Sequence, residues 1–161
     1  MGERIFGVGF LLFSKTANDS LKLFTVEELG SKPRYHKFQG MKSFPLETFE
    51  EKDGSFKETI LRLLTEEVGI KKSEAKIINI AAPYFQLIPG RNDIYTVYGY
   101  GLYLGNSNET FVPNDVDIRF AGWKTIDELL QQYIRVEVAP ILKHFTDNHL
   151  AELLNELSAT A

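Results

Sequence analysis

Apolar residues in the first third of the chain occur in short runs that are typical of strands. Residues 5–13 (IFGVGFLLF) and 21–26 (LKLFTV) are rich in branched and aromatic side chains. The polar cluster at 16–20 between them is a turn signal, so we expect a hairpin. Residues 35–38 alternate and predict a further short strand. Residues 41–54 include four acidic residues and are interpreted as a long loop.

The rest of the chain carries a second pair of strand patterns and then two helical ones. Strand-forming residues at 76–88 and 94–104 flank the turn signal PGRND at 89–93, which predicts a second hairpin. Two further helices are expected, at residues 124–130 and 137–157. The second of these is expected to break in two near Asp147-Asn148.

The best-defined element is a helix over residues 55–70 (SFKETILRLLTEEVGI), because both of its ends carry signals. Ser55 and Glu58 form a capping box pattern, in which each side chain accepts a backbone N–H of the first turn. Gly69 supplies the left-handed residue that commonly follows the last turn. At about 100° per residue, one apolar stripe forms from Phe56, Ile60, Leu63 and Leu64.

Glu67 departs from this pattern, because the same rotation places it within the apolar stripe. An unpaired buried charge is too costly, so this carboxylate must be solvated, paired or bound to a metal. Glu66 and Glu67 together also oppose the helix dipole at its C-terminal end. The pair is therefore either a solvated acidic helix end or part of a functional site.

Composition indicates one globular domain spanning residues 1–161. Hydrophobic residues make up 43% of the chain and charged residues 25%, which is ordinary for a soluble protein. The net charge of −4 gives no basic excess to favour nucleic-acid binding. The absence of cysteine excludes disulfides, thiol catalysis and zinc–thiolate sites, and it fits a reducing compartment. The apolar run at 5–13 is too short to span a bilayer and precedes no cleavage site, so we expect a cytoplasmic protein without a membrane partner.

Residues 62–70 (RLLTEEVGI) resemble the second half of the Nudix box, G-x5-E-x7-R-E-U-x-E-E-x-G-U, in which U is a bulky aliphatic residue. The matching positions are Arg62, Leu64, Glu66, Glu67, Gly69 and Ile70. A second resemblance to Nudix proteins follows in the expected order, with Asp117-Ile118, Trp123 and Asp127-Glu128-Leu129. The resemblance implies the α/β (α+β) Nudix fold, a mixed β-sheet sandwiched between α-helices.

The chain departs from the box at three positions. The glutamate that follows the arginine, one of the family's metal-binding positions, is Leu63. Counting back from Arg62, the box glutamate falls on Gly54 and the box glycine on Thr48. If Gly40 stands for that glycine, several extra residues lie between it and the helix.

The resemblance implies hydrolysis of a nucleoside diphosphate linked to another moiety, with Mg²⁺ or Mn²⁺ as cofactor. Glu66 and Glu67 are then the metal ligands and catalytic residues, and Arg62 orients Glu66. Candidates to replace the missing ligand are Glu47, Glu50, Glu51, Asp53 and Asp117. Candidates for binding a small-molecule nucleotide substrate are Lys42 and Arg91, through its phosphates, and Tyr84, through its base.

Three interpretations remain open at this point. The chain is a Mg²⁺-dependent Nudix pyrophosphohydrolase, or a Nudix-like domain that binds a nucleotide or a protein without turnover, or a structural domain with an accidental acidic pair. Leu63 and Gly54 are the strongest signals for the second interpretation. The sequence leaves the identity of the substrate open, and also whether the protein forms a homodimer.

Overall fold

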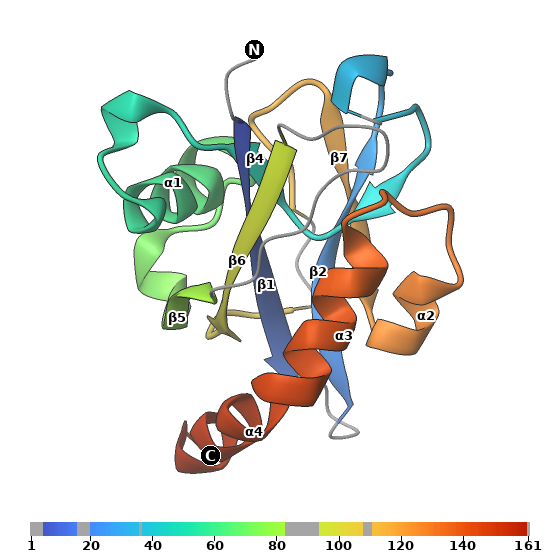
Figure 1. The fold of residues 1–161 in the computed structure, drawn as a ribbon. Coiled ribbons are helices and arrows are strands. Elements are labelled where there is room, and N and C mark those ends of the chain that lie inside the picture. Colours follow the sequence, from blue (N-terminus) through green and yellow to red (C-terminus); the bar gives the residue numbers. More distant parts are fainter. Residues whose placement is uncertain (1–4, 16–19, 36, 83–93, 108–110, 161) are drawn as a thin grey trace.

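A computed structural model describes residues 5–15, 20–35, 37–82, 94–107 and 111–160, and it shows a mixed sheet with helices on both faces (Figure 1). The strands are β1 (Ile5–Lys15), β2 (Leu21–Glu28), β3 (Lys42–Ser43), β4 (Leu46–Thr48), β5 (Ala75–Ala82), β6 (Ile94–Tyr103) and β7 (Ile118–Lys124). The helices are α1 (Phe56–Arg62), which continues as a π-helical turn over Leu63–Glu67, α2 (Ile126–Leu130), α3 (Val138–Asn148) and α4 (Leu150–Thr160). Short 3₁₀ turns lie at Pro33–Tyr35, Glu51–Asp53 and Lys72–Glu74.

The sheet has the strand order β3-β2-β1-β6-β5, with β4 paired to β1 and β7 paired to β2. The neighbours β1 and β6 are parallel, and the chain between them includes α1 as part of the crossover that parallel strands require. The predicted hairpin of β1 with β2 and the antiparallel pairing of β5 with β6 are confirmed. The turn predicted at 89–93 lies outside the described residues.

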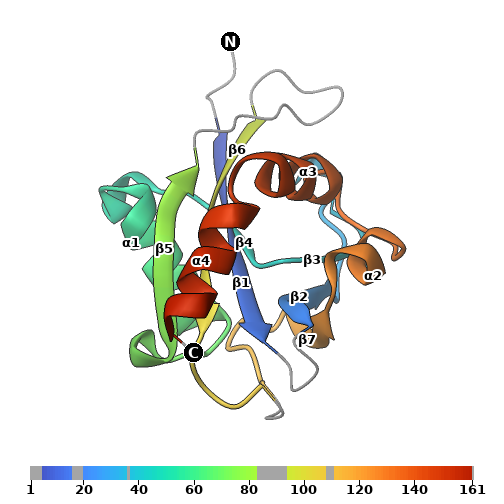
Figure 2. The same ribbon diagram turned by 90° about the horizontal axis from the view of Figure 1, so that it is seen from below.

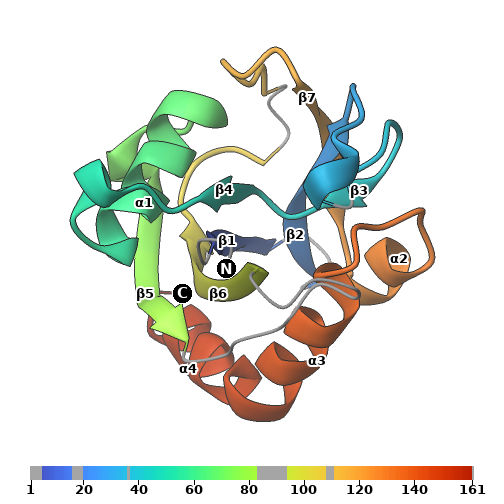
Figure 3. The same cartoon turned by 45° about the horizontal axis from the view of Figure 1, so that its top comes forward.

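Alternate side chains of β1 enter two separate cores, one on each face of the sheet. Val8, Phe10 and Leu12 pack on the side of α1, whereas Leu11 and Phe13 pack against the C-terminal helices. Figure 3 shows α1 on one side of the sheet and α3 with α4 on the other. The predicted sandwich of a mixed sheet between helices is therefore confirmed.

Two predictions for the segment before α1 are wrong. The strand predicted at 35–38 is replaced by the 3₁₀ turn Pro33–Tyr35 and a single bridge between Lys32 and Lys37. A proline has a fixed φ and no N–H, so it favours the start of a turn over a place in a ladder. The loop predicted at 41–54 instead contains β3, β4 and a 3₁₀ turn.

Both predicted C-terminal helical segments are confirmed. In α2, the Glu128 N–H donates to Thr125 Oγ1 at 3.1 Å and the Thr125 N–H donates to Glu128 Oε1 at 3.0 Å, which completes a capping box. The longer segment breaks after Asn148, and α4 begins at Leu150. Within the described ranges, every helix is too short or too polar to cross a membrane.

Candidate functional site

Helix α1 begins and ends at the residues that the sequence marks. The Glu58 N–H donates to Ser55 Oγ at 3.2 Å, and Gly69 has a φ of +74°. The last turn is π-helical, because the Val68 N–H donates at 3.1 Å to the carbonyl of Leu63, five residues earlier. Such a turn changes the angular positions of the side chains that follow, and π turns are frequent at functional sites.

The π turn separates Glu67 from the apolar stripe. Leu64 and Val68 are buried in the core, whereas Glu66 is exposed and Glu67 is half-buried. The prediction that Glu67 lies within the core-facing stripe is therefore wrong. The Glu67 carbonyl accepts the N–H of Asn114 at 2.7 Å, so the loop before β7 closes over this end of the helix.

Leu63, at the position where the Nudix box has a glutamate, is a core residue. Its side chain has an exposed fraction of 0% and packs in the same cluster as Phe10, Phe24 and Ile60. A carboxylate at this place would have no water and no partner, which is costly. The structure therefore assigns this position to packing.

Arg62 does not orient Glu66, contrary to our expectation. Its guanidinium forms a two-pronged contact with Asp53, from Nε to Oδ1 at 3.0 Å and from Nη2 to Oδ2 at 2.9 Å. It also donates to the Thr48 carbonyl at 3.2 Å and lies 3.5 Å from Glu47 Oε2. Helix side chains lean toward the helix N-terminus, so Arg62 reaches back to the segment before α1 and away from Glu66.

The partner of Arg62, Asp53, lies one residue before the position at which the Nudix box pattern places its glutamate. It directly precedes Gly54, the position that the box pattern assigns to a glutamate. Hydrogen bonds from Arg62, together with those from the Glu50 N–H and the Thr59 hydroxyl, lower the pKa of Asp53 from 3.8 to about 2. Its side chain is 5% exposed, so the carboxylate is held in place while charged. Allowing a one-residue shift in the spacing would have identified it.

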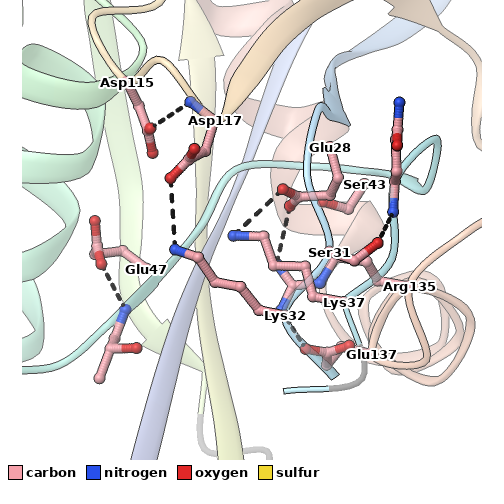
Figure 4. Close-up of polar contacts among 12 residues, drawn as sticks. Glu28, Ser31, Lys32, Lys37, Ser43, Glu47, Asp115, Asp117, Arg135 and Glu137 are labelled. Carbon is pink, nitrogen blue, oxygen red and sulfur yellow. Dashed lines mark hydrogen bonds and ion pairs between the residues drawn. The ribbon is translucent and has the colours of Figure 1, made fainter. Parts of the chain in front are cut away.

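Glu47 on β4 is the second carboxylate of the predicted loop that reaches Arg62. It lies mostly out of solvent, and burial raises its pKa, an effect that nearby Asp115 and Glu50 reinforce while Arg62 opposes it. Figure 4 shows Glu47 on the same side of the sheet as Asp115 and Asp117, which come from the loop before β7. The fold thus brings a carboxylate from β4 to the loop that closes over the end of the helix.

The other predicted site residues lie in different surroundings. Asp117 is about half exposed and pairs with Lys32 at 3.5 Å, and no contact joins it to Glu66 or Glu67 among the described residues (Figure 4). Lys42 Nζ lies 3.3 Å from Glu27 Oε1, which ties it to β2. Tyr84 and Arg91 lie outside the described residues.

A buried charged cluster, which the sequence did not reveal, flanks this face of the molecule. Arg135 lies 3.5 Å from Glu28 and 2.9 Å from Glu137, and Lys37 lies 3.3 Å from the second oxygen of Glu28 (Figure 4). Burial raises the pKa of Glu28, while Lys37 and Arg135 oppose that change. The cluster joins β2 to the segment before α3.

The acidic pair at the end of the helix is a partial set of ligands for a divalent metal ion. Among the described residues, no three His, Asp, Glu or Cys side chains come close enough together to hold a metal. Glu66 and Glu67 offer two carboxylates, and Mg²⁺ is commonly held by one or two carboxylates together with water and substrate phosphates. The residues therefore fit a Mg²⁺ ion that enters with a diphosphate, and they do not form a complete cage.

Comparisons with solved structures identify the fold. The Nudix domain of Shewanella oneidensis NrtR, solved with ADP-ribose, superposes with a TM-score of 0.64 at 15% identity over 91% of this chain and 89% of that one. A MutT/Nudix family protein from Listeria innocua has a TM-score of 0.64 at 16% identity, covering 96% and 99%. The Ap4A hydrolase of C. elegans has a TM-score of 0.56 at 12% identity, covering 98% of both chains. No protein-family model and no curated protein sequence matches the chain.

Proposed function

Starting from the Nudix fold that the chain adopts, we propose that it hydrolyses a nucleoside diphosphate linked to another moiety in the presence of Mg²⁺ or Mn²⁺. The observation that carries the proposal is the position of Glu66 and Glu67. They form an accessible carboxylate pair at the end of a helix whose other side is anchored by Arg62 and Asp53. Solved neighbours named for ADP-ribose and Ap4A support a nucleotide with linked phosphates as the substrate class.

Each residue has a distinct part in this proposal. Glu66 and Glu67 would hold the metal, which supplies charge neutralisation at the phosphate oxygens. Glu47 is our choice for the group that accepts a proton from the attacking water, because its raised pKa brings it nearer to neutral pH than an ordinary carboxylate. Arg62 and Asp53 position β4 against α1 and thereby hold Glu47 near the helix.

A second candidate function is binding of the same nucleotide class without turnover. The specific observation in its favour is Leu63, which removes one carboxylate from the box and is wholly buried. A domain with two metal-binding carboxylates can still bind a Mg²⁺–diphosphate complex through its phosphates. The two functions share a ligand and differ only in whether it is cleaved.

The test is phosphate release from a panel that includes ADP-ribose, Ap4A and nucleoside triphosphates, with Mg²⁺ and a coupling phosphatase. Wild type is compared with Glu67→Gln and with the control Glu58→Gln, which changes an exposed glutamate near the start of the same helix. Turnover that needs the metal, collapses in Glu67→Gln and survives in Glu58→Gln supports hydrolysis. Metal-dependent binding by calorimetry without turnover supports the second candidate, and neither binding nor turnover in folded protein contradicts both.

We also propose a cytoplasmic location for this activity. The chain contains no cysteine, so it needs no oxidising compartment to fold. A nucleotide substrate and Mg²⁺ are both available to a protein in the cytoplasm. Fractionation of the source cells, with the protein followed by antibody, tests this placement.

A further inference from the structure

A groove of about 300 Å³ lies between α1 and β5, on a part of the molecule that the proposed function does not use. Its apolar floor is formed by Leu61, Leu64, Ala75, Ile77 and Ile78, and its polar members are Lys57, Thr65 and Lys72. The helical members recur three and four residues apart, so they form one face of α1 and its π turn. No acidic side chain lines the groove within the described residues.

Strand β5 borders this groove and is the last strand of the sheet on this side. It follows β6 at the end of the strand order, and Figure 2 shows it at the margin of the sheet, between α1 and α4. In the described part of the chain, its backbone hydrogen bonds within the sheet run to β6 alone. Over residues 75–78, no described residue pairs with its outer row of N–H and C=O groups, which can therefore accept another extended segment.

The usual protection of a strand edge is incomplete at the start of β5. Edges are commonly guarded by a lysine or by a bulge. Here Lys76 Nζ is held 2.8 Å from Glu156 of α4, which draws the side chain away from the groove. A register shift between Ile77 and Asn79 ends the regular ladder, so the unguarded stretch is short and runs over residues 75–78.

Two lysines at the groove carry positive charge without an acidic partner among the described residues. Lys57 and Lys72 are both exposed, and across the described residues neither makes a salt bridge. Two unpaired ammonium groups beside an apolar floor favour a ligand with acidic groups next to apolar ones. They also oppose a second copy of this chain in an edge-to-edge dimer, because the same lysines would approach one another.

We propose that this groove binds an extended segment of a partner protein in which an apolar stretch is flanked at both ends by acidic residues. The segment adds to the edge of β5 over residues 75–78, places its apolar side chains between α1 and β5, and pairs its carboxylates with Lys57 and Lys72. Recognition of this kind takes affinity from backbone hydrogen bonds and specificity from the side-chain groove. Neither Glu66 nor Glu67 lines the groove, so it serves a role in addition to nucleotide chemistry.

The probe for this surface is a fluorescein-labelled peptide of about ten residues, in which valine and threonine alternate at the centre and two glutamates stand at each end. Its binding is followed by anisotropy, beside a peptide with lysine in place of glutamate and one with a central proline. We expect the acidic peptide to bind about tenfold more tightly than either control. Equal binding of the acidic and basic peptides would overturn the proposal.

Protein variants locate the contact. Lys57→Glu with Lys72→Glu is expected to weaken binding of the acidic peptide about tenfold, because two attractions become repulsions. The matched control, Lys22→Glu with Lys143→Glu, makes the same change in net charge on β2 and α3 and is expected to change affinity less than about twofold. All variants are checked for unchanged thermal unfolding, and an unchanged affinity in the first pair would contradict the assignment.

Hydrogen exchange then tests whether the peptide extends the sheet. Bound acidic peptide is expected to slow exchange of backbone amides within residues 75–78, since new strand pairing protects them. Binding without protection there would refute strand addition. A peptide-free dimer that shows the same protection would identify a second copy as the occupant and would also refute the proposal. Phosphate release is measured in the same variants, so a failure of this surface is distinguishable from a failure of the proposed hydrolysis.

Discussion

Leu63→Glu restores the side chain that the Nudix box calls for, and the structure predicts that it will destabilise the protein without activating it. The leucine is 0% exposed. Removing its burial costs about 2–3 kcal/mol. The introduced carboxyl adds the cost of a buried polar group without a partner, about 1–3 kcal/mol even when it is protonated. The expected loss of about 4 kcal/mol is a large part of the 5–15 kcal/mol typical of a domain.

Two companion variants separate the causes of that loss. Leu63→Met conserves volume and should cost under about 1.5 kcal/mol. Leu63→Gln has a similar shape to the glutamate variant but cannot ionise. Burial would raise the pKa of the introduced carboxyl above its unfolded value of about 4.3, so the unfolded state ionises first as pH rises. The glutamate variant should therefore match the glutamine variant near pH 4 and become less stable than it toward pH 7.

Urea unfolding followed by fluorescence supplies the measurement, because the chain has one tryptophan, Trp123, which packs against the same core cluster as Leu63. Phosphate release with Mg²⁺ is measured in parallel on the folded fraction. If Leu63→Glu stays within about 1 kcal/mol of wild type and gains Mg²⁺-dependent turnover, position 63 faces the site and the assignment to the core is refuted.

Three further predictions concern hydrogen bonds seen in the structure. Hydrogen bonding to Arg62 lowers the native pKa of Asp53 to about 2, so its stabilisation is present above pH 4 and is lost as pH falls toward 2; Asp53→Asn should cost up to about 2 kcal/mol at pH 7 and little at pH 2 in urea titrations. Burial and neighbouring His149 lower the native pKa of His144, which bonds Tyr98 Oη at 2.7 Å. The unfolded state therefore binds protons more readily, stability should fall as pH drops through about 6.5, and His144→Gln should flatten that dependence in thermal unfolding. Thr125→Ala removes the N-cap of α2 and should lower the unfolding free energy by about 1 kcal/mol, with Thr125→Ser close to wild type by the same measurement.

The features predicted correctly from sequence are those whose causes are local or periodic. Ser55 and Gly69 bound α1 because a cap and a left-handed residue act on the nearest turn. The strands β1 and β6 follow from continuous apolar runs, which suit strands covered on both faces. Their parallel pairing was not deducible from the runs themselves, because it depends on how the connecting chain crosses the sheet.

The errors arise where the cause lies elsewhere in the fold. The partner of Arg62 is Asp53, in a 3₁₀ turn that the loop prediction did not contain. Helical spacing placed Glu67 on the core stripe, and only the π turn, closed by the Val68 N–H on the Leu63 carbonyl, changes that position. Pattern reading assumes a uniform rotation per residue, so it cannot anticipate such a turn. The sequence named Glu47 only as one of five possible metal ligands, whereas its contact with Arg62 depends on the placement of β4 beside α1.

Under the proposed function, α1 and its π turn divide their residues between stability and chemistry. Arg62 bonds the carboxylate of Asp53, and Leu63 is buried in the apolar core. Both residues therefore stabilise the fold without a metal. Glu66 and Glu67 instead destabilise the helix, because two negative charges near its C-terminal end oppose its dipole. A cation between or beside them removes that cost, and a phosphate-bound Mg²⁺ supplies one without needing the ligand that Leu63 has replaced. The proposed Mg²⁺ ligand would therefore account for an acidic pair that the stability of the helix alone does not favour.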